Sequence, residues 1–146
     1  MKSPVRIVAG ITAGFSVWAV LWFAGTAAAQ ATFSDLSEGQ PITHSGYLWL
    51  YIVLSATLSL LAGSVTALIA RSSRVIAVWL FALIQQAFGV VAEMSYWNLM
   101  PVWYHLVFLS LIIPMTILGG WMAATIKHKS NRQNGNSKVA FHLDTV

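Results

Sequence analysis

The sequence predicts an all-α integral membrane protein, a four-transmembrane-helix antiparallel bundle with its N and C termini in the cytoplasm. Two observations lead to this fold class: long apolar stretches with few charges, and the segregation of the basic residues. The 146 residues are 58% hydrophobic and 8% charged, whereas a soluble domain carries roughly 25% charged residues. The eight basic residues are Lys2, Arg6, Arg71, Arg74, Lys127, Lys129, Arg132 and Lys138.

Four stretches are long enough to cross a bilayer, which takes about 20 mostly apolar residues. Backbone groups in lipid must bond within their own segment, so each stretch is expected to be a helix. The polar residues 127–146 cannot build a core, and we expect them to form a disordered cytoplasmic tail behind one membrane domain, residues 1–126. The expected spans are about 7–29, 46–70, 75–96 and 102–126.

The basic residues also predict the orientation, since Lys and Arg collect in short cytoplasmic loops. Both termini and the turn from Arg71 to Arg74 are therefore expected to face the cytoplasm, and the loop 30–43 and the turn at Asn98 to face outside. Topology and the attraction of lipid headgroups explain the net charge of +4, so we expect the lipid bilayer as a partner and no nucleic acid. We expect a multi-pass protein of the inner (plasma) membrane.

Aromatic residues gather at the expected outer ends of the spans, as in an interfacial belt. The belt is uneven, because all four tyrosines lie on that side, which leaves open an outer contact with another protein or a lipid-like ligand. The outer set is Tyr47, Trp49, Tyr51, Tyr96, Trp97, Trp103 and Tyr104.

The first span has an alternative interpretation as a cleaved secretory signal. Basic residues, an apolar run and three alanines at 27–29 are typical of such a signal. The apolar run of about 20 residues, however, exceeds the usual 7–15 of a signal core. Gly10 and Gly14 also have the spacing that lets two membrane helices approach closely. We therefore favour a retained helix.

Small residues recur at the same spacing in two other spans. In lipid, such residues allow close backbone contact, and van der Waals packing drives helix association. The sequence leaves open whether the partner helix belongs to the same chain or to another copy. The predicted packing residues are Ser55, Ser59, Gly63 and Ala67 in the second span, with Gly119 and Gly120 in the fourth.

The third span carries the candidate site. Gln85 and Glu93 share one helical face, with Gln86 beside them, and an ionisable residue within a span is a functional candidate by default. Glu93 lies six residues before Leu99 and His105 six after it. In an antiparallel hairpin both then sit ~9 Å from the turn.

His44, at the start of the second span, is expected on the same side of the membrane as Glu93 and His105. A Glu93–His105 pair could be a structural hydrogen bond that locks the hairpin, which we favour, or could hold a proton, a metal or a quinone-like head group. The three residues only reach the minimum ligand number for a metal and lack motif spacing. No metal site and no cofactor are therefore predicted.

The segment Trp97–Tyr104, together with Pro114 and the sequence Leu118-Gly119-Gly120, resembles an uncharacterised family of small bacterial four-helix inner-membrane proteins. The resemblance covers mainly the last two spans, about a third of the chain. It implies the four-helix architecture and brings no functional residues.

The chain contains no phosphate-binding glycine loop, zinc-helix motif or serine elbow. We therefore expect no enzyme. The favoured function is a non-enzymatic structural or accessory subunit of a larger membrane complex, or a homo-oligomer. The alternative is a membrane carrier or binding protein for a proton, a metal or a small lipophilic ligand, using Glu93 and His105.

Overall fold

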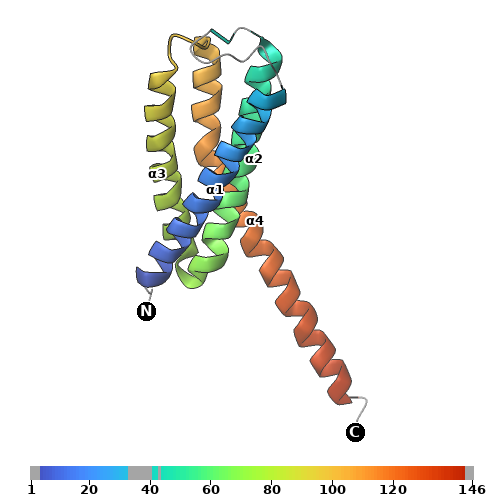
Figure 1. The fold of residues 1–146 in the computed structure, drawn as a ribbon. Helices are drawn as coiled ribbons and strands as arrows, with labels where there is room; N and C mark the ends of the chain where they lie inside the picture. The colour runs from blue at the N-terminus through green and yellow to red at the C-terminus, as the bar shows by residue number, and fades with distance from the viewer. Residues whose placement is uncertain (1–3, 33–40, 43, 144–146) are drawn as a thin grey trace.

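Four α-helices make up most of the described chain. The computed structural model describes residues 4–32, 41–42 and 44–143, with side chains as far as residue 126. No strand occurs within these ranges, so the predicted all-helical class is confirmed. The elements are α1 (Pro4–Thr32), α2 (Ser45–Ala70), the short 3-10 turn η1 (Arg71–Ser73), α3 (Arg74–Ser95) and α4 (Val102–Leu143) (Figure 1).

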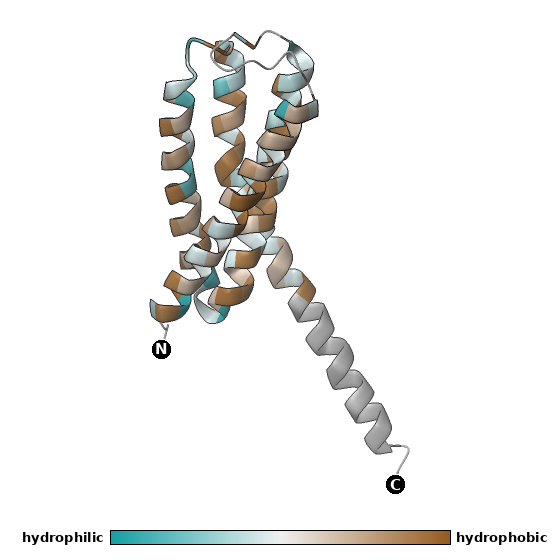
Figure 2. Ribbon diagram, viewed as in Figure 1, coloured by the Kyte–Doolittle hydropathy of each residue, from teal (hydrophilic) through white to brown (hydrophobic). Residues whose placement is uncertain are grey.

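Three helical stretches are long and apolar enough to cross a membrane: Pro4–Thr32, Ser45–Ser95 and Val102–Ile126. The middle stretch contains α2, η1 and α3, which fold back on each other as a hairpin (Figure 1). Hydrophobic residues, brown in Figure 2, run along each helix of the bundle. The backbone of α4 is helical to Leu143, across most of the segment expected to be a disordered tail, whose side chains lie outside the described residues.

The turn between α2 and α3 is tight because Arg71 adopts a positive φ of 49°. An L-residue other than glycine rarely takes this conformation, and holding it costs on the order of 1–3 kcal/mol. Ser73 precedes α3 as its N-cap, but its side chain makes no capping hydrogen bond. The chain therefore reverses direction here through a strained arginine and an uncapped helix start.

The α2–α4 contact is close enough that two glycines lie against backbone of the opposite helix. A Cβ atom on Gly63 would collide with the carbonyl oxygen of Thr116, and one on Gly119 with that of Leu60. Ser64 Oγ lies 2.9 Å from the carbonyl oxygens of both Leu60 and Gly119. The predicted stripe of small residues on α2 lies buried in the bundle: Ser55, Ser59, Gly63 and Ala67.

Helix α1 packs against the other side of α2, also through glycines. A Cβ atom on Gly10 would lie 2.9 Å from the carbonyl oxygen of Thr66, and one on Gly14 would lie 3.0 Å from that of Ala62. Both glycines are buried. Since α2 contacts α1, α3 and α4, it is the central helix of the bundle.

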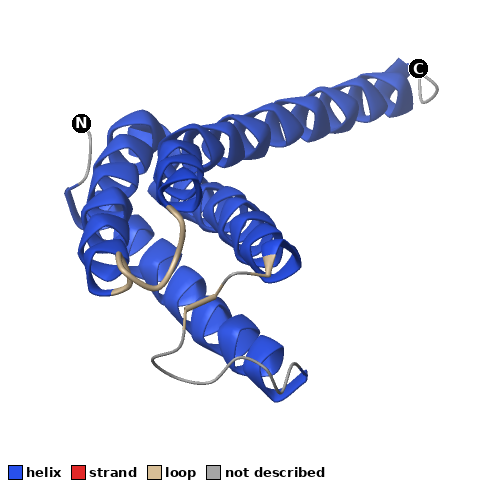
Figure 3. Ribbon diagram, turned by 90° about the horizontal axis from the view of Figure 1, so that it is seen from above, coloured by secondary structure: helices blue, strands red, loops and turns tan. Residues whose placement is uncertain are grey.

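Two connections meet at the end of the bundle opposite η1 (Figures 1 and 3). The backbone N–H of Ile42, just before α2, donates to the carbonyl oxygen of Leu99 in the α3–α4 turn (2.8 Å). Below this turn a cluster of buried apolar side chains joins α2 to α4. Its buried members on these two helices are Leu48, Tyr51, Ile52, Tyr104, Phe108 and Ile112.

Candidate functional site

A buried acid–histidine pair joins α3 to α4 near the turn. Glu93 lies in the last turn of α3, and His105 lies in the first turns of α4. His105 Nδ1 and Glu93 Oε2 are in hydrogen-bond contact and form an ion pair when the histidine is protonated. His105 is 0% exposed and Glu93 is 7% exposed. The structure therefore brings these two predicted site residues together in the interior.

The second ring nitrogen of His105 determines how the pair holds its hydrogens. Nε2 lies 3.2 Å from the carbonyl oxygen of Met100, which can only accept, so Nε2 carries a hydrogen. Nδ1 then either donates to a charged Glu93 or accepts from a neutral one. In both forms a single hydrogen lies between the side chains. The pair can thus shift a hydrogen internally without gaining or losing one.

Aromatic rings enclose the histidine. The ring of Trp97 stacks on that of His105 at 4.6 Å between centroids and 14° between planes. The Tyr104 ring meets the imidazole nearly edge-on, at 5.6 Å and 76°. Trp97 is itself 47% exposed, so it covers the pair from outside.

A second polar cluster links three helices further along the bundle. Gln85 on α3 is 0% exposed, and its Nε2 donates to Ser59 Oγ on α2 (2.8 Å). Thr116 Oγ1 on α4 donates to Gln85 Oε1 (2.9 Å) and also lies 2.8 Å from the carbonyl oxygen of Ile112. Both ends of the Gln85 amide are therefore bonded within the chain, and the glutamine ties α2, α3 and α4 together.

The other two predicted site residues stand apart from these clusters. The side-chain oxygen of Gln86 is buried without a hydrogen-bond partner. His44 is exposed ahead of α2, with its ring 5.0 Å from that of Tyr47, and no hydrogen bond or ion pair joins it to Glu93 or His105. In the part of the chain that the structure describes, no three His, Cys, Asp or Glu residues gather as metal ligands.

Sequence reasoning missed Thr116 and the hydrogen bond made by Ser59. A signal for Thr116 was present, since it follows His105 by eleven residues, about three helical turns, and so shares its face of α4. The sequence predicts Ser59 as a packing residue because of its small size, and in the structure its hydroxyl also accepts a hydrogen bond from Gln85.

We predict that Gln85→Leu destabilises the protein, because it removes the interhelical hydrogen bonds that join Gln85 to the Ser59 and Thr116 hydroxyls. Interhelical hydrogen bonds in membranes contribute about 0.6 kcal/mol each, so we expect a loss of about 1 kcal/mol in the free energy of unfolding. The matched control is Gln86→Leu, which removes an unpartnered oxygen and should be neutral or stabilising. Unfolding of both variants in mixed micelles, followed by circular dichroism, measures the difference; equal losses would contradict the assignment.

Two cavities lie at the other end of the bundle. They have volumes of about 470 Å³ and 230 Å³, and Arg74 lines both. Neither is lined by Glu93, His105 or Gln85. The buried polar clusters and these cavities are thus separate features.

Comparison with known proteins found no matching family, no similar curated protein and no similar solved structure. The resemblance of the segment around Trp97–Tyr104 to a family of small inner-membrane proteins therefore stays a prediction.

Proposed function

We propose that this protein is a four-span inner-membrane protein that performs no chemistry and acts as a homo-oligomer or as an accessory subunit of a larger membrane complex. The observation that carries this proposal is that the polar side chains of both buried clusters have their hydrogen-bond partners within the chain. Gln85 is bonded at both ends of its amide, and both ring nitrogens of His105 have a hydrogen-bond partner. Polar groups that already have partners stabilise a bundle and leave little capacity for a substrate.

The proposed membrane arrangement has α1, α2, α3 and the first part of α4 as spans. The hairpin at η1 supports separate spans for α2 and α3, because its turn is only three residues long. Arg71 and Arg74 at this turn support a cytoplasmic location for it, and hence for both termini. The close packing of Gly10 and Gly14 on α2 supports a retained first span.

We expect native mass spectrometry in mild detergent to find two or more copies of the chain, or a second protein in fixed stoichiometry. A strictly monomeric species without such a partner would contradict the proposal. The absence of cysteine makes single-cysteine variants clean probes of orientation in the same preparation. A membrane-impermeant maleimide should label Gly46→Cys in intact cells and Ser72→Cys only after permeabilisation; the reverse pattern would overturn the orientation.

A second candidate function is that of a carrier centred on Glu93 and His105. It is favoured by the single hydrogen held between two ionisable side chains within a span, where such residues often mark proton pathways. Among the residues that the structure describes, only two potential metal ligands meet there, below the three of a catalytic zinc site. This candidate is therefore a proton or small lipophilic ligand carrier, and the Glu93→Gln variant discussed below separates it from the structural role.

A further inference from the structure

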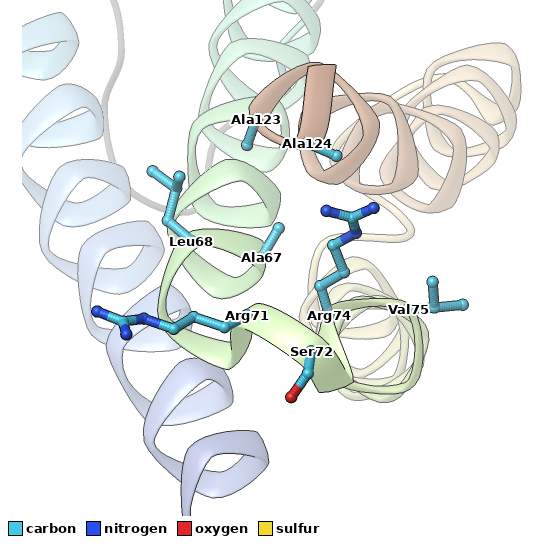
Figure 4. A pocket seen from close by; sticks show the side chains of 8 residues that line it. All are labelled: Ala67, Leu68, Arg71, Ser72, Arg74, Val75, Ala123 and Ala124. Atoms are coloured by element: carbon cyan, nitrogen blue, oxygen red, sulfur yellow. The ribbon is translucent and has the colours of Figure 1, made fainter. Parts of the chain in front are cut away.

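The larger cavity, about 470 Å³, opens at the turn between α2 and α3 (Figure 4). The end of α2, the turn η1, the start of α3 and the α4 segment near residue 123 all contribute to its wall. Apolar side chains form most of this wall, and two arginines provide its charge. The lining residues are Ala67, Leu68, Arg71, Ser72, Arg74, Val75, Ala123 and Ala124.

The two arginines of this cavity have no acidic partner among the described residues. The ion pair among the described residues joins Glu93 to His105, and both of these lie at the other end of the bundle. Both arginines are exposed. Figure 4 shows Arg71 extending toward α1 and Arg74 extending toward α4, so the two side chains stand on different sides of the cavity. One positive charge thus stands on each of these two sides of the cavity.

The start of α3 adds to this preference for an anion. Arg74 and Val75 are the first residues of α3, and both line the cavity. Ser73 makes no capping hydrogen bond, and the backbone N–H of Arg74 donates to the carbonyl oxygen of Arg71. The helix dipole at this end favours a phosphate-like anion. Arginine guanidinium groups bind phosphate through paired hydrogen bonds.

Arg71 occupies a backbone position that suits glycine better. Its φ of 49° is in the region that residues with a Cβ rarely adopt. Strain of this kind is a reason to look for function at the residue that bears it. An arginine in this conformation suggests that its charge is useful at the turn.

The smaller cavity, about 230 Å³, continues from the same place between α3 and α4. It shares Arg74, Val75 and Ala124 with the larger cavity. Its remaining wall consists of apolar and aromatic residues and one glycine: Val78, Trp79, Ile117, Gly120 and Trp121. A positively charged cavity thus adjoins an apolar groove. Together they match an anion that carries an apolar chain.

We propose that the Arg71–Arg74 cavity binds the phosphate of an anionic membrane phospholipid, with one acyl chain in the α3–α4 groove. The 26 residues of α2 span roughly 39 Å at 1.5 Å per residue, longer than the ~30 Å hydrocarbon core. The turn at its end therefore lies at headgroup depth. The site requires that the bundle crosses the membrane and is independent of the oligomeric role proposed above.

The test uses the full chain reconstituted in phosphatidylcholine, with brominated phosphatidylglycerol as the quencher of tryptophan fluorescence. We expect tighter binding of brominated phosphatidylglycerol than of brominated phosphatidylcholine. The double variant Arg71→Gln/Arg74→Gln should lose this preference, by roughly fivefold for each arginine. The control for the loss per arginine is Arg6→Gln, which removes one positive charge from an exposed position on α1 that does not line the cavity.

Two further variants separate binding from folding. Arg71→Gly removes the charge and accepts the positive φ without strain, so it should fold and still lose phosphatidylglycerol preference. Ala124→Leu keeps the net charge and narrows the passage between the cavities, so it should weaken binding of the lipid. An unchanged preference in the Arg71→Gln/Arg74→Gln and Arg71→Gly variants would overturn the proposal, as would an equal loss in Arg6→Gln. Thermal stabilisation by inorganic phosphate equal to that by phosphatidylglycerol would show a free-phosphate site and also overturn it.

Discussion

Replacing His105 with leucine should lower the free energy of unfolding by about 3–5 kcal/mol, because it leaves the buried Glu93 carboxyl without its partner. His105 is fully enclosed by Trp97, Tyr104 and the α3–α4 turn, so water cannot easily replace the lost contact. The carbonyl oxygen of Met100 loses its donor in the same variant. Reversible unfolding in mixed micelles, followed by circular dichroism, measures the loss.

Two controls separate the pair from a simple loss of volume. In Glu93→Gln, the amide can donate to Nδ1 of a neutral His105, so we expect a loss of only about 1 kcal/mol. The double variant Glu93→Leu/His105→Leu removes both polar partners and should be more stable than His105→Leu alone. The single variants Glu93→Leu and His105→Leu complete the comparison. If their losses in the free energy of unfolding simply add in the double variant, the two residues are not coupled, and the pair does not hold the hairpin together.

The same Glu93→Gln variant distinguishes the structural role from a proton carrier. The structural role needs only the hydrogen bond between α3 and α4, so the variant should behave as wild type apart from its small loss of stability. A carrier needs an ionisable acid, so the variant should fold normally and lose proton uptake in proteoliposomes that contain a pH-sensitive dye. Dye-reported uptake by the wild type that is absent in a folded Glu93→Gln protein would therefore favour the carrier over the structural role.

Depth in a helical hairpin can be counted along the sequence, whereas the neighbour that a given face of a helix meets cannot. Counting from Leu99 gave Glu93 and His105 the same depth, and the structure brings them together. For His44 the sequence predicts only the same side of the membrane as this pair, and in the structure His44 lies exposed ahead of α2. Its position depends on how α2 meets the α3–α4 turn, which the local sequence does not encode.

Neighbouring residues on α3 show the same limit. Gln85 and Gln86 differ by about 100° around the helix axis, which is enough to give one two hydrogen bonds and leave the oxygen of the other without a partner. The polar content of this span and the all-helical class could be read from the sequence. The choice of Ser59 and Thr116 as partners depends on the crossing of three helices, and that crossing is a property of tertiary packing.

Small residues at regular spacing likewise predicted close contacts without naming the partner helix. In the structure Gly10 and Gly14 meet α2, while Gly63 and Gly119 form the α2–α4 crossing. The small residues along α2 thus already pack against helices of the same chain. Under the proposed oligomeric role, contacts with another copy or another protein must use other surfaces, such as the exposed apolar side chains of α3 at Leu83, Phe88 and Val91.

Gly119→Ala should destabilise the bundle by about 2–3 kcal/mol, since overpacking a tight contact costs amounts of this order. The added Cβ would meet the carbonyl oxygen of Leu60, and a backbone atom on the central helix cannot move without shifting α2.

The matched control is Gly120→Ala, one residue further along the same helix. Its Cβ would lie 2.8 Å and 3.0 Å from the two methyl groups of Val78, so a side chain has to shift there and no backbone atom does. Both variants gain about the same helix propensity, roughly 1 kcal/mol relative to glycine, so the difference between their unfolding free energies isolates the backbone collision. Equal stabilities would mean that α2 and α4 do not cross at Gly119.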